Sequence, residues 1–263
     1  DIEKLEAISA DNQLEMLFYQ AQEENDTSRL VKLKLFHTGE PIHLSDVLPI
    51  LENFGLRVIG ESPYAIETTD GKIYWVLDFS MLLTGEYAFN LQDVQSLFQD
   101  AFAKVWSGEL ENDGFNRLIL SANLDWRETA LLRAYAKYMW QIGSSFSQHY
   151  VEETLAAYPK LARHIVDYFY QKFDPSSNRD KRREKSLRAK IIDGLENVSN
   201  LDQDRILNRY LELIDVTIRT NFFQSDEQGK PKSYISIKLT PAKIIDIPRP
   251  APMFEIFVYF LYV

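Results

Sequence analysis

The chain has 263 residues and a mass of 30.7 kDa, which allows one large domain or two of ordinary size. It contains 39 Asp and Glu against 29 Lys and Arg, and the resulting net charge of -10 argues against general nucleic-acid binding. The complete lack of cysteine excludes disulfides, thiolate zinc sites, iron–sulfur clusters and cysteine nucleophiles.

The composition, with 45% hydrophobic and 26% charged residues, is typical of a soluble globular protein. The N-terminus shows neither a basic region nor an apolar targeting segment, and it lacks an initiator Met, so we expect a processed start or a cut from a longer chain. The apolar run 253–263 is too short to span a bilayer as a helix. We therefore expect a cytoplasmic protein without membrane contact.

Alternating and helical patterns follow one another at the start of the chain. Residues 14–20 are compatible with a short strand or a helical turn, whereas residues 30–36 alternate apolar and lysine side chains as a half-buried strand does. Residues 44–54 place leucines and valine at helical spacing, and Gly55 stands where a left-handed C-cap is expected.

Two further strands are predicted at 56–59 and 73–81, with Asp70-Gly71 as the turn before the second. Residues 91–106 are amphipathic with helical period. The order over 14–107 is β-β-α-β-β-α, which predicts an α+β two-layer sandwich: an antiparallel sheet with two helices on one face.

Residues 111–223 are predicted to be entirely helical. Asp125 is the expected N-cap of a helix that ends at Gly143. Further helices are expected over these ranges: 147–157, 161–173, 180–196 and 202–222. Pro159 and Pro175 mark two of the breaks between them.

The C-terminal part changes character again. Residues 233–239 alternate as a strand, and four prolines between 241 and 252 exclude helix and favour an extended linker. Residues 254–260 are predicted to form a buried central strand that is apolar on both faces, and 253–263 are expected to pair with 233–239 or with a second copy.

Searches for catalytic motifs find neither a glycine-rich dinucleotide loop, nor a P-loop, nor the zinc-protease or serine-hydrolase signatures. With only 10 glycines, phosphate-cradling loops are few. His37 and His43 flank Glu40 and are compatible with a weak metal site, but polar loop residues are the preferred interpretation.

Two other histidines lie near acidic residues at helical spacing. His149 and Glu153 are four residues apart, and His164 and Asp167 three residues apart. Such pairs are usually surface contacts on a helix.

One basic cluster interrupts the acidic chain. Phosphate, RNA or an acidic protein surface are candidate ligands, but a solvated or salt-bridged helix face is preferred. Its members are Arg179, Lys181, Arg182, Arg183, Lys185, Arg188 and Lys190. A series of aromatic residues between Tyr135 and Phe173 is interpreted as helical core and subunit interface.

Three stretches resemble a known family. They are residues 44–59, residues 126–138, and residues 229–236 leading to 252–259. All three are similar to the large bacterial NAD-specific glutamate dehydrogenases, in which ACT-like modules and a helical region precede a dehydrogenase core.

The resemblance implies an ACT-like domain over 1–110, a helical domain over 111–228, and a linker with the first strands of the core over 229–263. In the family the last strand leads into a segment with substrate-binding and catalytic lysines, whereas this chain departs at Phe260 and stops at Val263. We therefore assign no catalytic, cofactor-binding or metal residue here, and expect NAD only in the parent enzyme.

The resulting hypothesis is a non-catalytic fragment of an NAD-dependent glutamate dehydrogenase. The parent is expected to deaminate L-glutamate oxidatively to 2-oxoglutarate and ammonia, and the fragment to serve regulation or homo-oligomer assembly together with the rest of the chain. Two alternatives stay open: an ACT-like module that senses an amino-acid effector, and a purely structural scaffold.

Overall fold

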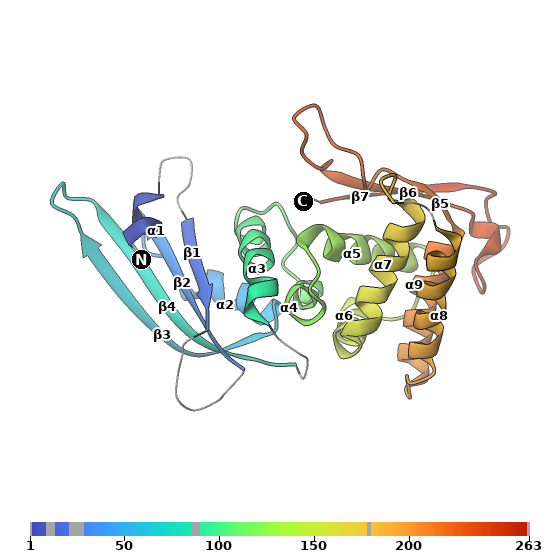
Figure 1. Cartoon of the computed structure of the whole chain (residues 1–263), viewed down its shortest axis with the longest axis horizontal. Helices are drawn as coiled ribbons and strands as arrows, with labels where there is room; N and C mark the ends of the chain where they lie inside the picture. The colour runs from blue at the N-terminus through green and yellow to red at the C-terminus, as the bar shows by residue number, and fades with distance from the viewer. Residues whose placement is uncertain (1, 9–13, 21–28, 86–89, 178–179, 262–263) are drawn as a thin grey trace. The chain divides into compact units, whose positions relative to one another are not determined.

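The computed structural model describes residues 2–8, 14–20, 29–85, 90–177 and 180–261 (Figure 1). The chain divides into two compact units. The first comprises Asp1–Gly108 with Asn112–Trp126, and the second comprises Glu109–Glu111 with Arg127–Val263. Within the described ranges, no helix combines the length and apolar character that a bilayer-spanning segment needs.

A four-stranded antiparallel sheet with strand order β1-β2-β4-β3 forms one layer of the first unit. Its strands are β1 (Leu14–Tyr19), β2 (Leu30–Thr38), β3 (Leu56–Glu67) and β4 (Ile73–Leu83). Val31, Leu33 and Leu35 of β2 are fully buried, because the period of two directs all three to one face. Of the two structures considered for 14–20, the strand is confirmed, because Leu14–Tyr19 pairs with β2 as β1.

Helices α2 (Leu44–Asn53) and α3 (Leu91–Trp106) form the second layer (Figure 1). The ring of Phe98 on α3 lies 4.2 Å from that of Phe18 on β1 and 4.9 Å from that of Phe54 after α2. Sheet and helices therefore share one aromatic core. The predicted α+β two-layer sandwich and its element order are confirmed.

The end of α2 depends on a glycine. Gly55 has φ +78°, the left-handed conformation predicted for its C-cap position, and its N–H donates to the carbonyl of Glu52. A Cβ at this position would also lie 2.8 Å from Cγ of Arg117. Both the backbone conformation and the space therefore require glycine.

The second strand pair is longer than predicted. β3 extends to Glu67 and pairs with β4 along its whole length around the turn at Gly71. Pro63 and the polar residues near it hide this strand in the sequence, but β3 lies at the sheet edge, where a proline is tolerated. Three short helices were not predicted individually: α1 (Ile2–Glu6), η1 (Gly114–Asn116) and α4 (Arg117–Ala122).

Five helices form the larger part of the second unit. They are α5 (Trp126–Gln141), α6 (Gln148–Ala157), α7 (Pro159–Phe173), α8 (Lys181–Leu195) and α9 (Leu201–Val216). Ser147, Asp180 and Asn200 cap α6, α8 and α9 through side-chain oxygens that accept backbone N–H groups. The predicted break at Pro159 is confirmed: α6 ends at Ala157, and Pro159 opens α7 because proline fits the first helical position.

The helix predicted over 202–222 is wrong beyond Val216. Residues Thr217–Thr220 form strand β5 instead, since three of the four are β-branched and the segment pairs with β6. The Thr217 hydroxyl lies 2.7 Å from the Leu213 carbonyl and 2.9 Å from the hydroxyl of Tyr135, so the junction is buried and hydrogen-bonded.

A three-stranded antiparallel sheet of order β5-β6-β7 completes the second unit. β6 (Tyr234–Leu239) and β7 (Glu255–Phe260) pair from Tyr234 with Phe260 to Leu239 with Glu255, which confirms their predicted pairing. The prediction of a central strand is wrong for this chain, because β7 is an edge strand. The proline-rich segment also contains a single 3-10 turn, η2 (Pro241–Lys243), where proline again takes the first position.

One face of this sheet packs against helices. Ile235, Ile237 and Leu239 of β6 are fully buried. The ring of Tyr138 on α5 lies 5.4 Å from that of Phe257, and its hydroxyl donates to Glu255 at 2.8 Å. The residues of β6 and β7 that alternate with these helix-facing residues point to the opposite face of the sheet.

We predict that Asp125→Ala destabilises the chain by about 1 kcal/mol, because Asp125 immediately precedes α5 and is the expected cap of that helix. Chemical denaturation measures the change. Asp193→Ala, at an exposed interior position of α8, is the control and should stay within about 0.5 kcal/mol of wild type. Equal stability of the two variants would mean that α5 is capped by other groups.

Candidate functional site

The structure does not gather the histidines into a site. Among the described residues, no group of three or more His, Asp or Glu side chains is placed to hold a metal ion. His37 lies in β2, one residue before the strand ends, and His43 precedes α2, with Glu40 in the connection between them. The preferred interpretation as polar loop residues is confirmed for Glu40 and His43 but is wrong for His37, which pairs with Trp75 in the sheet.

The two predicted histidine–acid pairs lie on helices α6 and α7. Nδ1 of His149, an exposed side chain, lies 4.0 Å from the carboxylate of Glu152, the residue before its predicted partner. Asp167 accepts a hydrogen bond of 2.9 Å from Nε of Arg163, four residues earlier on α7. Both are contacts between neighbours on one helix.

The basic cluster lies along α8 as an exposed helix face. Lys181 forms an ion pair of 3.0 Å with Glu184, and Arg188 one of 3.0 Å with Asp215 of α9. The predicted solvated and salt-bridged face is therefore confirmed for Lys181–Lys190, whereas Arg179 lies outside the described residues.

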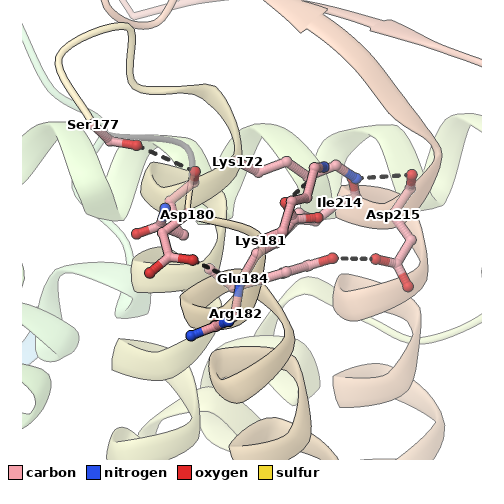
Figure 2. A network of polar contacts seen from close by, with 10 residues as sticks. Lys172, Ser177, Asp180, Lys181, Arg182, Glu184, Ile214 and Asp215 are labelled. Atoms are coloured by element: carbon pink, nitrogen blue, oxygen red, sulfur yellow. Dashed lines mark hydrogen bonds and ion pairs between the residues drawn. The ribbon is translucent and has the colours of Figure 1, made fainter.

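A network of polar contacts joins the ends of α7, α8 and α9 (Figure 2). We call Tyr168, Lys172, Lys181, Glu184, Arg188 and Asp215 the Lys172 cluster. Nζ of Lys172 donates to the carbonyl oxygens of Ile214, at 2.6 Å, and Asp215, at 2.9 Å. These carbonyls belong to the last turn of α9, where a cation satisfies both the unpaired acceptors and the helix dipole.

Asp215 is the acid at the centre of this cluster. One carboxylate oxygen accepts the hydroxyl of Tyr168 at 2.6 Å, and the other accepts Nε of Arg188 at 3.0 Å. Burial, reinforced by the bond to Asp215, raises the pKa of Tyr168, so the phenol stays protonated and donates. The bond to Asp215 in turn raises the pKa of Arg188.

Lys172 is the partly buried cation of the cluster. Burial lowers its pKa, while the charges of Asp215 and Glu184 act in the opposite direction. A lysine held beside a cavity with a lowered pKa is a candidate for ligand binding.

The buried face of α5 carries a second set of charged contacts. The carboxylate of Glu128 accepts two hydrogen bonds, of 2.9 and 2.7 Å, from the guanidinium of Arg163 on α7. Arg127 donates to the carbonyls of Phe222 at 2.7 Å and Lys232 at 3.1 Å, and its guanidinium lies over the Phe222 ring. These contacts join α5 to α7 and to the connection between β5 and β6.

A groove of about 640 Å³ beside α9 brings further charges together. Its charged lining residues pair locally: Arg209 lies 2.6 Å from Glu212, and Arg205 lies 3.2 Å from Asp202 at the groove's margin. With three arginines and four acidic residues, the described lining of this groove has no excess of positive charge.

Neither the Lys172 cluster nor the Glu128–Arg163 pair was predicted from the sequence. The spacing of Tyr168 and Lys172 places both on one face of α7. Their acceptors at Ile214 and Asp215 lie more than 40 residues away, and no local pattern connects them.

Three family models match separate parts of the chain. Residues 13–94 match the ACT3 domain of glutamate dehydrogenase, and residues 110–175 match its helical motif 3. Residues 190–263 match the catalytic domain of bacterial NAD-glutamate dehydrogenase. The Lys172 cluster thus includes residues from both of the last two matched ranges.

Whole-chain comparisons find the same group of proteins. The chain is 43% identical to the NAD-specific glutamate dehydrogenase of Halomonas elongata over 258 residues, 98% of its own length. It is also 43% identical to that of Pseudomonas aeruginosa over 98% of its length, and 34% identical to that of Mycobacterium tuberculosis over 90%. The chain spans 15–16% of the length of these curated relatives.

We predict that Glu128→Gln destabilises the chain by about 1–3 kcal/mol, because it removes a charge-assisted, twofold contact with Arg163 from a buried carboxylate. Thermal and urea unfolding measure the loss. The control is Arg205→Gln, which breaks an exposed ion pair and should cost less than about 1 kcal/mol. Equal losses in the two variants would contradict the role of Glu128 in holding α5 to α7.

Proposed function

Because this chain is a region of the large bacterial NAD-specific glutamate dehydrogenases, covering the ACT3 domain, helical motif 3 and part of the catalytic domain, we propose that it is a non-catalytic part which serves regulation and homo-oligomer assembly. In this proposal the whole enzyme deaminates L-glutamate oxidatively to 2-oxoglutarate and ammonia in the cytoplasm, and passes a hydride to NAD. Residues 1–110 form its ACT-like domain, 111–228 a helical domain, and 229–263 the first strands of the core.

The observation that carries this proposal is the uncovered face of the β5-β6-β7 sheet. Ile256 is 63% exposed, Val258 40% and Phe260 64%, and these alternate residues form one stripe along β7. The residues between them face the helices. An antiparallel sheet with one solvated face normally carries polar side chains on that face, so an exposed apolar stripe of this kind marks a contact surface.

The occupant that we propose for this face is the remainder of the catalytic domain. The sheet lies within the range matched by the catalytic-domain model, and the chain represents about one sixth of its relatives' length. Those relatives therefore contain ample further chain to pair with the free edge of β7 and to cover its apolar stripe.

Assembly is supported by a second exposed edge, in the first unit. β3 is a 12-residue edge strand on which Ile59, Tyr64 and Ile66 are exposed. A long edge strand with apolar side chains is a template for pairing with another strand. A second copy of the same strand is the occupant that homo-oligomer assembly implies.

Amino-acid sensing by the ACT-like unit is the alternative that the ACT3 match favours. A ligand that binds only the folded state raises the apparent stability of that state. A thermal-shift panel of amino acids on this chain therefore separates a sensing module, which responds to one of them, from a scaffold, which responds to none.

We predict that the isolated chain neither produces NADH from glutamate nor binds NAD. A dinucleotide site of the Rossmann type needs a glycine-rich loop at a helix N-terminus to hold the pyrophosphate, and no such motif is present in the sequence. Absorbance at the NADH band and titration calorimetry measure the two properties. Micromolar NAD binding or glutamate-dependent NADH formation would contradict the proposal of a non-catalytic part.

We predict that the triple variant Ile256→Thr, Val258→Thr, Phe260→Thr is less prone to self-association than wild type while it keeps its melting temperature. The three side chains are exposed, and threonine retains the preference for strand. Light scattering measures the mass, and Ser236→Ala on the same face is the control. An unchanged mass would mean that other surfaces hold any oligomer together.

The same three substitutions in a full-length dehydrogenase should lower stability by several kcal/mol, since each buried apolar side chain contributes about 1.5–3 kcal/mol. Thermal unfolding of the two full-length forms decides this point. Equal melting temperatures would mean that the remainder of the catalytic domain does not cover this face.

A further inference from the structure

A cavity of about 550 Å³ lies beside the Lys172 cluster. It is lined by the end of α7, the start of α8 and strand β5, and so combines elements that are adjacent in the fold but separate in sequence. Its volume is within the range of cavities that hold small molecules.

The lining of this cavity has an excess of positive charge. Lys172, Lys181 and Arg219 contribute three cations, whereas Glu184 contributes the one carboxylate among the lining residues the structure describes. Lys181 forms an ion pair of 3.0 Å with Glu184, so the lining keeps a net excess of two positive charges over three cationic side chains. A local excess of this sign is notable in a chain with a net charge of -10.

Lys172 is held in place for a further contact. Its ammonium group has three N–H donors, and the carbonyls of Ile214 and Asp215 accept two of them. The remaining donor is available to a ligand in the cavity. Burial disfavours the charged form of this lysine, and a bound anion would compensate for that cost.

Arg219 brings the second charge from the sheet. It pairs in register with Lys238 of β6, so two cations stand opposite each other on neighbouring strands, an arrangement that is destabilising by itself. Nζ of Lys238 lies over the ring of Phe254 at 4.8 Å, on the side of β7. Arg219 is thus the cation of this strand pair that lines the cavity.

From this arrangement we propose that the cavity binds a small oxyanion, a carboxylate or phosphate group, between Lys172, Lys181 and Arg219. The amide of Gln171 adds a hydrogen-bond donor, and the ring of Phe223 adds an apolar wall for the carbon part of a ligand. The groove beside α9 differs because its lining has no excess of positive charge, and it is the internal comparison. Binding here would link the helical region to the first strand of the matched catalytic-domain sheet.

The first test is titration calorimetry of the 263-residue chain with inorganic phosphate and, separately, with succinate, in a buffer without other multivalent anions. We expect saturable one-to-one binding of at least one probe, and the stronger probe identifies the group that is recognised. The double variant Lys181→Gln, Arg219→Gln should weaken binding at least tenfold. The matched control Arg182→Gln, Lys190→Gln removes two exposed cations of α8 and should leave the affinity unchanged.

Protection of Lys172 from acylation is the second test, because Lys172→Gln would also disturb the end of α9. Limited reaction with acetic anhydride, followed by mass spectrometry, should show severalfold slower modification of Lys172 in the presence of the bound probe. Lys190 should react at the same rate with and without it. Absence of saturable binding of both probes, or equal affinity of the double variant and wild type, would overturn the proposal.

Discussion

The change from helix to strand after Val216 is the constraint on which the second unit depends. α9 must end there for β5 to enter the sheet, and its last carbonyls must then find donors. Lys172 of α7 supplies two N–H groups, and the Thr217 hydroxyl bonds to both the Leu213 carbonyl and Tyr135. One lysine and one threonine thus connect α7, α9 and α5 at the point where the sheet begins.

The ion pairs near this junction orient the helices relative to one another more than they add to the net free energy of folding. Glu128 with Arg163 and Asp215 with Arg188 are ion pairs that lose hydration on folding, and such pairs often contribute little net free energy. Breaking one of them is costly nevertheless, because it leaves a partly buried charge without its partner. We therefore regard these pairs as determinants of how the helices are aligned beneath the sheet.

The two sheets leave different surfaces uncovered. In the first unit one face is closed by α2 and α3 through the rings of Phe18, Phe54 and Phe98. In the second unit the helices close one face, and the apolar stripe of β7 remains on the other. The proposed assembly role and the proposed anion site both follow from this second sheet, the first from its outer face and the second from its edge strand β5.

The sequence by itself determined the elements whose pattern is local. Alternation along β2, the helical period of α3 and the glycine after α2 predicted the α+β two-layer sandwich, because the repeat of each element decides which side chains share a face. The same reasoning predicted helices over 147–157 and 180–196, which are α6 and α8. It failed at β3, where Pro63 interrupts the pattern, and at Thr217, where helical periodicity continues past the true end of α9.

Only the tertiary structure decided which distant groups meet. The acceptors of Lys172 lie more than 40 residues along the chain, and Arg127 reaches carbonyls at Phe222 and Lys232, about 100 residues away. Folding of the whole chain brings these distant groups together, whereas sequence periodicity predicts only which residues of one helix or strand share a face. Periodicity likewise predicts that alternate apolar side chains of β7 share one face. Only the folded sheet shows that this face is exposed.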